Sequence, residues 1–390
     1  MNYNFTQKNK IVFLVCMAIG VISISASFIT HSHQAWPNLL MNNFYFMAIA
    51  LGGTFFLAVQ YVAEVGWSVV IKRVLESMGQ WLLFAMVLMI IIFLAGKHHL
   101  YHWTHSELYD PNSPEYDTIL VGKSGFLNEP FFIIRMILYL VIWVGFTKLL
   151  RKGSLAMEIS NGVEHYRKNV RYSATFLVLF AITSSTSAWD FIMSIDAHWF
   201  STLFGWYTFA GIFISALSVL ALLVVYLKSN GYLPEVKDSH LHDIGKFMFA
   251  FSIFWTYLWF AQFMLIWYAN LPEEVTYYMT RFDHYRGMFV GTFFINFICP
   301  FLVLMASDAK KRTGILAVVA SILFIGHWMD LFVMIMPGTV GEHWHIGWME
   351  IGTTIGFAGA FLYSTFHYLS KAALVPANHP MLQESLHHTT

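Results

Sequence analysis

The chain consists of long apolar segments that alternate with short polar ones, a pattern typical of proteins that cross a membrane several times. About 20 apolar residues in a helix span the hydrocarbon core of a bilayer. Runs near this length predict ten transmembrane helices, at residues 11–30, 42–63, 81–96, 130–150, 173–193, 203–227, 246–268, 288–306, 315–336 and 348–369. We therefore expect an all-α membrane protein in which residues 1–371 form one polytopic domain.

The connections between the predicted spans are short except at residues 97–129 and 150–172. Because short connections place consecutive helices side by side, spans two to five and spans six to nine can each form a four-helix bundle, with spans one and ten flanking them. Four is an even number, so both sets would enter the membrane from the same side, as parallel repeats do. The tail, residues 372–390, contains Pro376 and Pro380 and predicts an irregular segment that needs a partner surface to become ordered.

The composition agrees with this pattern and gives it an orientation. Charged residues make up only 11% of the chain, whereas soluble domains average about 25%. Most of the 22 Lys and Arg residues lie in the loops on the side of the two termini, and cytoplasmic loops are those that collect positive charge. We therefore expect both termini in the cytoplasm. A basic approach and a Ser-x-Ala sequence make a cleaved signal peptide the alternative for the first span, although its apolar run is long for one.

The sequence has no motif for a bound redox cofactor. Cys16 and Cys299 lie in different spans, and neither a Cys-x-x-Cys-His motif for covalent haem nor a four-cysteine set for an iron–sulfur cluster is present. A haem held between helices would need two histidines at matching depth, but His327 lies toward the outer half and His367 near the inner end. Phosphate-binding and dinucleotide fingerprints are absent, and the net charge of zero gives no reason to expect nucleic-acid binding.

Asp190 lies at the end of the fifth predicted span, where a carboxylate is costly and is normally retained for a proton, an ion or a ligand. It shares one helix face with Thr183, Thr186 and Ser187, which precede it at helical spacing. This face could line a water-filled proton path to the outer side. Alternatively, the hydroxyls bond back to carbonyls of their own helix and Asp190 caps the following turn.

His327 and Asp330 lie one turn apart in the ninth span, so an imidazole–carboxylate pair can form on one helix face. Such a pair can accept and pass on a proton near neutral pH, while the alternative is a structural hydrogen bond between helices. Arg135 lies about one turn into the fourth span from its outer end. It either pairs with Asp190 or Asp330 or extends to the membrane interface.

Other polar residues of the spans complete the candidate proton path. They are Glu350, Thr353 and Thr354 near the outer end of the last span, Ser364 and His367 near its inner end, and Glu64 at the inner end of the second span. Residues 357–361 include no proton carrier, so a path along the last span needs water or another helix there.

Histidines are frequent in the predicted outer loops. His98, His102 and His105 have a spacing at which helical histidines can share a metal ion. No carboxylate or cysteine nearby completes a ligand shell, so we expect no metal. Tryptophans among these loops indicate interfacial belts and contacts with partner proteins instead.

Three segments of the sequence carry a resemblance to a known family. They are SAWDFIMSIDAHWFSTLFGWYTFAG (residues 187–211), WYANLPEE (residues 267–274) and PGTVGEHWHIGWMEIG (residues 337–352). With these segments the chain resembles the smaller of the two polysulfide-reductase-type (NrfD-like) integral membrane subunits of bacterial alternative complex III, a quinol:cytochrome c oxidoreductase. The resemblance extends from the first span to the tail, and it too implies ten spans arranged as two four-helix bundles with flanking helices.

The resemblance implies a place in the respiratory chain of the bacterial inner (cytoplasmic) membrane. The complex oxidises menaquinol and passes electrons, through periplasmic iron–sulfur and multihaem cytochrome c subunits, to a cytochrome c or an associated terminal oxidase. The quinol site of the family is usually attributed to the larger, second NrfD-like subunit. By this resemblance the present chain is a scaffold for the haem c and iron–sulfur subunits, surrounded by lipids and binding no cofactor of its own.

Two roles for the polar residues remain open under this hypothesis. Because quinol oxidation releases two protons, the outer acids could form a proton path. They could also border a menaquinone, and the residues that we expect beside it are Arg135, Asp190, Asp196, His198, His327 and Asp330. A stand-alone proton-coupled secondary transporter is the competing hypothesis, although Pro300 is the one candidate for the broken helix that transporters place at the membrane midplane.

Overall fold

The computed structural model describes residues 2–159 and 162–389, and in these residues the chain is helical without a β-strand. The long helices are α1 (Gln7–Thr30), α2 (Ser32–Val62), α4 (Leu82–Leu100), α6 (Glu129–Ile159), α7 (Val163–Phe191), α8 (Phe204–Ser229), α9 (Asp238–Ala269), α14 (Thr313–Thr339) and α15 (Trp348–Leu369). The short ones are α3 (Lys72–Gly79), α5 (Thr118–Lys123), α10 (Pro272–His284), α11 (Arg286–Phe293), α12 (Cys299–Leu304), α13 (Ser307–Lys311) and α16 (Leu382–Leu386). Single turns of 3₁₀ helix are η1 (Trp67–Ile71), η2 (His102–Thr104), η3 (Ser106–Tyr109) and η4 (Met193–Asp196), and η5 (Phe294–Ile298) is a π-helix.

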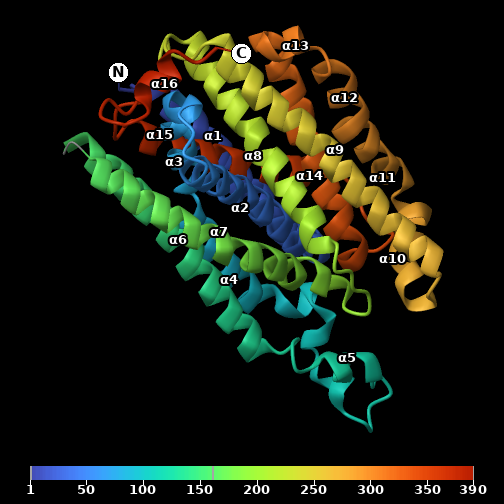
Figure 1. Cartoon of the computed structure of the whole chain (residues 1–390). Helices are drawn as coiled ribbons and strands as arrows, with labels where there is room; N and C mark the ends of the chain where they lie inside the picture. Colours follow the sequence, from blue (N-terminus) through green and yellow to red (C-terminus); the bar gives the residue numbers. More distant parts are fainter. Residues whose placement is uncertain (1, 160–161, 390) are drawn as a thin grey trace.

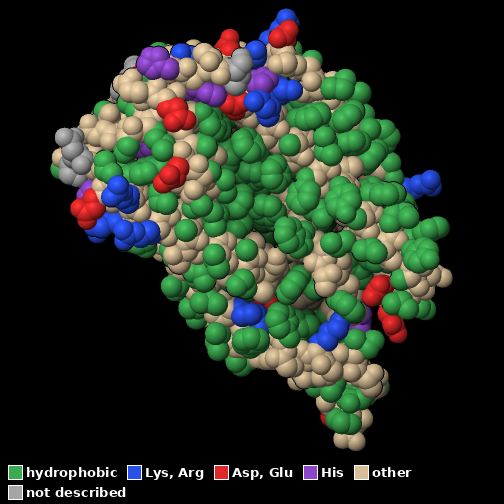
Figure 2. Space-filling view, viewed as in Figure 1, with side chains coloured by type: hydrophobic (Ala, Val, Ile, Leu, Met, Phe, Trp, Pro, Cys, Tyr) green, Lys and Arg blue, Asp and Glu red, His purple; other side chains and the backbone are tan. Residues whose placement is uncertain are grey.

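The long helices run side by side as one oblique bundle (Figure 1). One end of the bundle carries α16 and both termini and is called the α16 end. At the opposite end, the α5 end, a loop with α5 projects beyond the helices. Figure 2 shows hydrophobic side chains across the middle of the visible face and charged side chains gathered toward its ends, as expected of a surface that faces lipid.

Eight helical segments of the described residues are long and apolar enough to cross a membrane. They are Gln7–Thr30, Ser32–Val62, Trp67–Leu100, Glu129–Ile159, Phe204–Ser229, Asp238–Ala269, Arg286–Leu304 and Thr313–Thr339. The chain is therefore a multi-pass membrane protein. Two of the ten predicted spans, which correspond to α7 and α15, are helices but are not among the eight. Both are more polar: α7 begins with a charged segment, and α15 carries Glu350 and two threonines in its first turns.

Two features of the predicted spans differ in the structure. The third span was expected to begin at Trp81, and α4 does begin at Leu82, with Trp81 as its N-cap. Lys72 and Arg73, however, were expected in a loop and are buried in the short helix α3. The eighth span is not one regular helix, because the π-helix η5 separates α11 from α12. Pro300 lies in the first turn of α12, and since proline has no N–H to donate, it disturbs the regular hydrogen-bond ladder before it.

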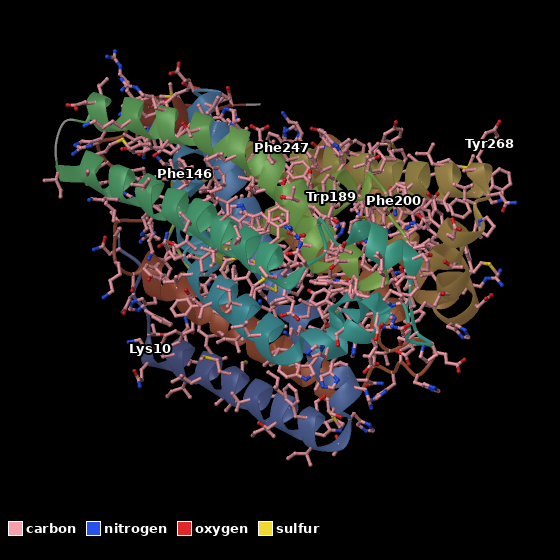
Figure 3. All side chains as sticks on the ribbon, turned by 90° about the horizontal axis from the view of Figure 1, so that it is seen from below. Lys10, Phe146, Trp189, Phe200, Phe247 and Tyr268 are labelled. Atoms are coloured by element: carbon pink, nitrogen blue, oxygen red, sulfur yellow. The ribbon has the colours of Figure 1, made fainter. Side chains whose placement is uncertain are left out.

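Helix α2 lies at the centre of the bundle and α1 at its periphery. In the most apolar stretch of α2, 83% of the residues are buried, whereas the share for α1 is 17%. Figure 3, which views the molecule from below, shows α1 at the edge, and Lys10 and Tyr268 toward opposite ends of the molecule. Helix α1 packs against α15 through a very close glycine contact: a Cβ atom added to Gly20 would lie 2.4 Å from the Cα of Gly356. Such close approach is typical of helix pairs in membranes.

The tail was expected to be irregular, but its described part contains α16 and is docked across the α16 end. Glu384 Oε1 accepts a hydrogen bond from the Gly66 N–H (3.1 Å), and the Ser385 hydroxyl donates to the Trp67 carbonyl (2.6 Å). His388 Nε2 lies 2.6 Å from Asp243 Oδ2, at the beginning of α9. The tail therefore connects the segment after α2 with α9.

Candidate functional site

Asp190, near the C-terminal end of α7, is held by two residues of α6. Arg135 reaches both carboxylate oxygens, with Nε 2.8 Å from Oδ2 and NH2 2.8 Å from Oδ1, and the Tyr139 hydroxyl donates to Oδ2 at 2.6 Å. The guanidinium also lies 4.0 Å from the ring centroid of Phe126 and donates to the Phe126 carbonyl. Asp190 is completely buried. Of the alternatives for Arg135, pairing with Asp190 is the one that the structure shows.

The hydroxyls on the same face of α7 bond to their own helix. Thr183 donates to the Leu179 carbonyl (2.8 Å), Thr186 to the Ile182 carbonyl (3.0 Å) and Ser187 to the Ser184 carbonyl (2.9 Å). Thr183 additionally accepts a hydrogen bond from Trp143 Nε1 (2.9 Å). This face of α7 therefore matches the second interpretation, in which the hydroxyls bond back to their own helix, because each hydroxyl proton is donated to a helix carbonyl.

Asp330, on α14, has a different environment. The Tyr207 hydroxyl of α8 donates to Oδ1 in a short hydrogen bond, and Trp255 Nε1 of α9 donates to Oδ2 at 3.1 Å. Within the described residues no Lys or Arg lies within 4.0 Å of this carboxylate. Among the described residues Asp330 therefore has no ion pair with Lys or Arg, whereas Asp190 has one with Arg135.

His327 lies beside Asp330 but does not bond to it. The distance from His327 Nδ1 to Asp330 Oδ2 is 3.9 Å, too long for a hydrogen bond. The ring is 3% exposed, and both of its nitrogens are without a hydrogen-bond partner in the described part of the chain. The predicted pair thus shares a helix face, but a third group is needed to connect its two members.

A small cavity borders the two residues. It has ≈ 20 Å³ of space open to a water molecule and is lined by Phe44, Tyr45, Ala48, Thr208, Gly211, Ile212, Ser215, His327, Asp330, Leu331 and Met334. One water needs about 10–15 Å³ of such space and two to four polar partners. The carboxylate, the imidazole and the Thr208 hydroxyl, which has no partner among the described residues, meet this requirement.

Helix α8 continues this polar environment toward the α16 end. One face of α8 presents, at helical spacing, Thr208, Gly211, Ser215 and Ser218. The threonine and the two serines are buried. The Ser218 hydroxyl also has no partner in the residues that the structure describes. We did not predict this face from the sequence, although its small polar residues at intervals of three and four were a readable signal.

Asp196 and His198 lie beyond Asp190, at the α5 end, and each has its own partner. Arg281 NH2 of α10 lies 3.1 Å from Asp196 Oδ2 and 3.2 Å from the Met334 carbonyl. His198 makes a short hydrogen bond with Asp117, which caps α5. Burial alone would raise the pKa of Asp117, but His198 and two backbone N–H groups outweigh burial and lower it. The six residues expected around a quinone are thus distributed over separate pairs.

The outer part of α15 belongs to an amide network that the sequence analysis missed. The Asn42 side chain of α2 donates to Asn38 Oδ1 (2.7 Å) and accepts from the hydroxyl of Thr354 (2.8 Å). Asn38 in turn donates to Thr353 (3.3 Å). Glu350 is buried and accepts a hydrogen bond from the Gly347 N–H (2.7 Å), which caps the start of α15. The asparagines in the otherwise apolar segment NLLMNNF were the available signal.

The three remaining candidates do not join these networks. Glu64 is exposed, with φ of 49°, in the turn after α2. Ser364 is buried, and its hydroxyl has no hydrogen-bond partner among the residues that the structure describes; His367 is half-buried near the end of α15. None of them is placed beside His327 or Asp330.

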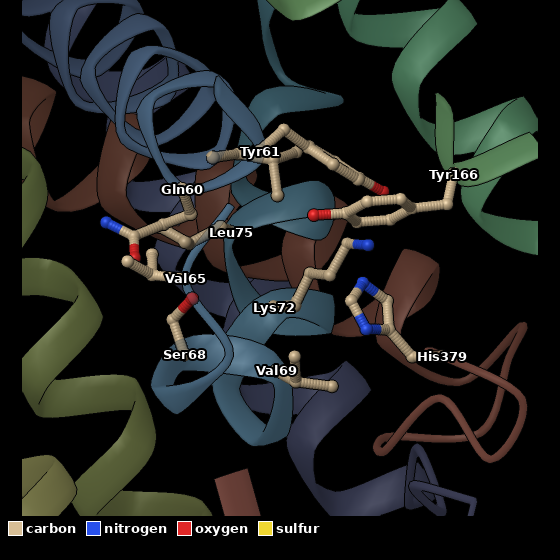
Figure 4. A pocket seen from close by; sticks show the side chains of 10 residues that line it. Gln60, Tyr61, Val65, Ser68, Val69, Lys72, Leu75, Tyr166 and His379 are labelled. Carbon is tan, nitrogen blue, oxygen red and sulfur yellow. The ribbon is translucent and has the colours of Figure 1, made fainter. Parts of the chain in front are cut away.

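A second charged cluster, at the α16 end, was also missed. Arg73 donates to Glu76 (2.7 Å) and to Glu158 of α6 (2.8 Å), and Arg151 donates to Ser77 (3.2 Å). Lys72 is 4% exposed, and its ammonium lies 4.0 Å from the Tyr61 ring centroid without a hydrogen-bond partner among the described residues. Figure 4 shows Lys72 beside Tyr61, Tyr166 and His379 in the lining of a small cavity.

The described residues include no group of three or more His, Cys, Asp or Glu side chains that could hold a metal ion. His98 and His105 lie near each other, with ring centroids 5.2 Å apart, but His98 Nδ1 is engaged with Thr104.

No protein-family model and no curated protein matches the chain. The fold and these sites define the class as a multi-pass helical membrane protein with several buried acids, among them Asp190, Asp330 and Glu76.

Proposed function

We propose that this chain is the smaller of two related membrane subunits of a quinol-oxidising respiratory complex and provides a proton path through Asp330. The observation that carries the proton path is the cavity of ≈ 20 Å³ between Asp330, His327 and Thr208. A water there would connect the carboxylate to the imidazole, which lie too far apart for direct transfer. Asp330 takes the role of proton carrier, His327 that of acceptor and Tyr207 that of the group that orients the acid.

The path extends in both directions from this centre. Toward the α16 end it follows the hydroxyl face of α8, from Thr208 to Ser218, with waters between the hydroxyls. Toward the α5 end, the Tyr207 hydroxyl donates a hydrogen bond to the Asp330 carboxylate. The ion pair of Arg281 with Asp196 lies beyond Tyr207 in this direction. Asp190 is a structural residue in this scheme, because its charge is compensated by Arg135.

The membership in a respiratory complex rests on the resemblance of residues 187–211, 267–274 and 337–352. In this proposal α7 and α15 also cross the membrane, giving ten spans in two bundles with flanking helices, and the α16 end faces the cytoplasm of a bacterium. The α5 end then faces the periplasm, where it supports the iron–sulfur and multihaem subunits. Menaquinone contact by this chain is secondary, since the six expected residues are distributed over separate pairs.

The transporter alternative has one observation in its favour, the interruption of a helix by η5 before Pro300. Asn296 in this π-helix is fully buried, and both of its amide atoms lack partners in the described residues. However, the cavity at Asp330 has room for about one water and not for a solute. A proton is the transported species that fits this size.

Two experiments test the two parts of the proposal separately. The tagged chain, purified from its native membranes in mild detergent, should bring along haem and iron–sulfur proteins; a colourless and stable isolated chain would contradict membership in the complex. In proteoliposomes containing the purified complex, Asp330→Asn should lower proton release coupled to quinol oxidation by about 100-fold. Asp283→Asn, at an exposed position of α10, is the matched control, and wild-type coupling in Asp330→Asn would remove the acid from the path.

A further inference from the structure

A groove at the α16 end of α6 combines positive charge with a lipid-facing position. It has a volume of ≈ 460 Å³ and is lined by Gln80, Lys148, Arg151, Lys152, Leu155, Ala156 and Ile159. Three of its seven lining residues are basic and none is acidic. Lys148 and Lys152 are exposed, and neither forms an ion pair within the described part of the chain. The groove therefore carries positive charge that is not paired with an acid in the described residues.

Arg151 is the fixed member of this group. Its residue is 6% exposed, and its guanidinium donates to the Tyr368 carbonyl at 2.7 Å and to the Ser77 hydroxyl at 3.2 Å. These bonds go to neutral acceptors, so they position the guanidinium without neutralising it. Glu76, which pairs with Arg73, attracts the Arg151 guanidinium electrostatically but does not bond to it, so the uncompensated charge of the groove is that of Lys148 and Lys152.

The same face of α6 continues as an apolar stripe toward the middle of the bundle. The stripe precedes Lys148 at intervals of three and four residues and consists of Ile134, Leu138, Val141 and Gly145. Its three large side chains are exposed to 60% (Ile134), 49% (Leu138) and 59% (Val141). No neighbouring atom lies within 4 Å of a Cβ built on Gly145. From Lys148 to Ile134 the helix rises about 21 Å, which is comparable to the length of an acyl chain.

We propose that this face of α6 binds an anionic phospholipid, with its phosphate at Lys148, Arg151 and Lys152 and an acyl chain along Gly145, Val141 and Leu138. Charge complementarity selects the headgroup, because basic pockets between membrane helices attract anionic lipids. The apolar stripe selects a lipid over a free anion. Such a lipid would fill the groove between α6 and the segment that carries Gln80, and would stabilise the buried charges next to it.

The test uses the purified full chain in neutral detergent, with lipid binding measured by native mass spectrometry. Phosphatidylglycerol should bind at low salt in preference to phosphatidylcholine. The double variant Lys148→Gln/Lys152→Gln should weaken phosphatidylglycerol binding about 25-fold, since each basic residue contributes about fivefold near an anionic headgroup. Lys168→Gln/Lys371→Gln removes two basic residues at the same end but outside the groove, and should bind phosphatidylglycerol as the wild type does.

Three outcomes would overturn the proposal. The first is equal binding of the two lipids by the wild-type chain. The second is equal loss in the groove variant and in the control variant, which would indicate general attraction to positive charge. The third is displacement of phosphatidylglycerol by millimolar inorganic phosphate, which would show a site for free anions. All three readouts are independent of electron transfer, so they do not depend on the proposed complex.

Discussion

Arg135 donates a hydrogen bond to each carboxylate oxygen of Asp190, both at 2.8 Å, in a part of the bundle where Asp190 is completely buried. This geometry is the bidentate pairing that is specific to arginine. The pairing argues against Asp190 as a proton carrier. A carboxylate that compensates a buried guanidinium cannot be neutralised without exposing that guanidinium to an apolar environment.

We therefore predict that Asp190→Asn destabilises the protein, by about 3–5 kcal/mol. The Arg135 charge would remain buried without its counterion. The double variant Arg135→Gln/Asp190→Asn should recover a large part of this loss, because it removes both charges. Thermal unfolding of the chain in detergent measures the difference. Asp190→Asn with wild-type stability would show that the pair is not structural, and would return Asp190 to the candidate proton carriers.

The sequence predicted the helices well and the partners of the polar residues poorly. Apolar runs are a local property, so the positions of most spans could be read directly. The common face of His327 and Asp330 was also predictable, because one helical turn separates them. The Tyr207 bond to Asp330, by contrast, joins residues 123 positions apart, and no pattern within one helix indicates which neighbour it faces.

Lys72 and Arg73 were expected in a loop but are buried in α3, and the reason is similar. Two consecutive basic residues normally indicate a loop, because isolated charges are costly to bury. Here Arg73 is buried because Glu158, which comes from a distant helix, and Glu76 compensate it. The compensation depends on helix packing and so could not be inferred from the local sequence.

Gly211 offers a test of the water-filled cavity that leaves both titratable residues in place. A Cβ at this position would lie 3.6 Å from His327 Nδ1 and 3.9 Å from Asp330 Oδ2, which are ordinary contact distances. Gly211→Ala should therefore fold normally and reduce the ≈ 20 Å³ cavity until no water fits. We predict an unchanged or higher unfolding temperature, since alanine favours helix, together with proton release lowered about tenfold or more.

The control for Gly211→Ala is Gly314→Ala on α14, where no atom lies within 4 Å of the added Cβ. It makes the same chemical change in a helix without touching the cavity. Equal proton release in the two variants would contradict a role for water between His327 and Asp330.

Gly20 tests the attachment of α1. Because its added Cβ would lie 2.4 Å from the Cα of Gly356, Gly20→Val must separate α1 from α15. We predict a loss of about 1–3 kcal/mol, as for other overpacked contacts, measured by thermal unfolding in detergent. Gly20→Ala should give a smaller loss in the same direction. Equal stability of wild type and Gly20→Val would refute the close contact.

His379 makes the docking of the tail dependent on pH. Burial, reinforced by the charges of Lys72 and Arg73, lowers its pKa to about 2, whereas a released tail would have the ordinary value of about 6.5. The Tyr61 and Tyr166 rings pack on its other sides. Because the folded pKa is depressed, docking is fully stable above pH of about 6.5. It should weaken as the pH falls below that value, by about tenfold in the docking equilibrium per pH unit.

Hydrogen exchange of residues 372–389 at several pH values, corrected for the intrinsic exchange rate, measures this docking. Protection in the wild type should decrease between pH 7 and pH 5. In His379→Phe, which keeps an aromatic ring between Tyr61 and Tyr166, this decrease should become clearly smaller, and the remainder comes from His240 and His388 at the tail contact. His387→Phe is the matched control, because His387 is exposed on the same tail, and it should retain the wild-type dependence. Protection that is constant with pH in the wild type, or lost equally in both variants, would show that His379 does not control the tail.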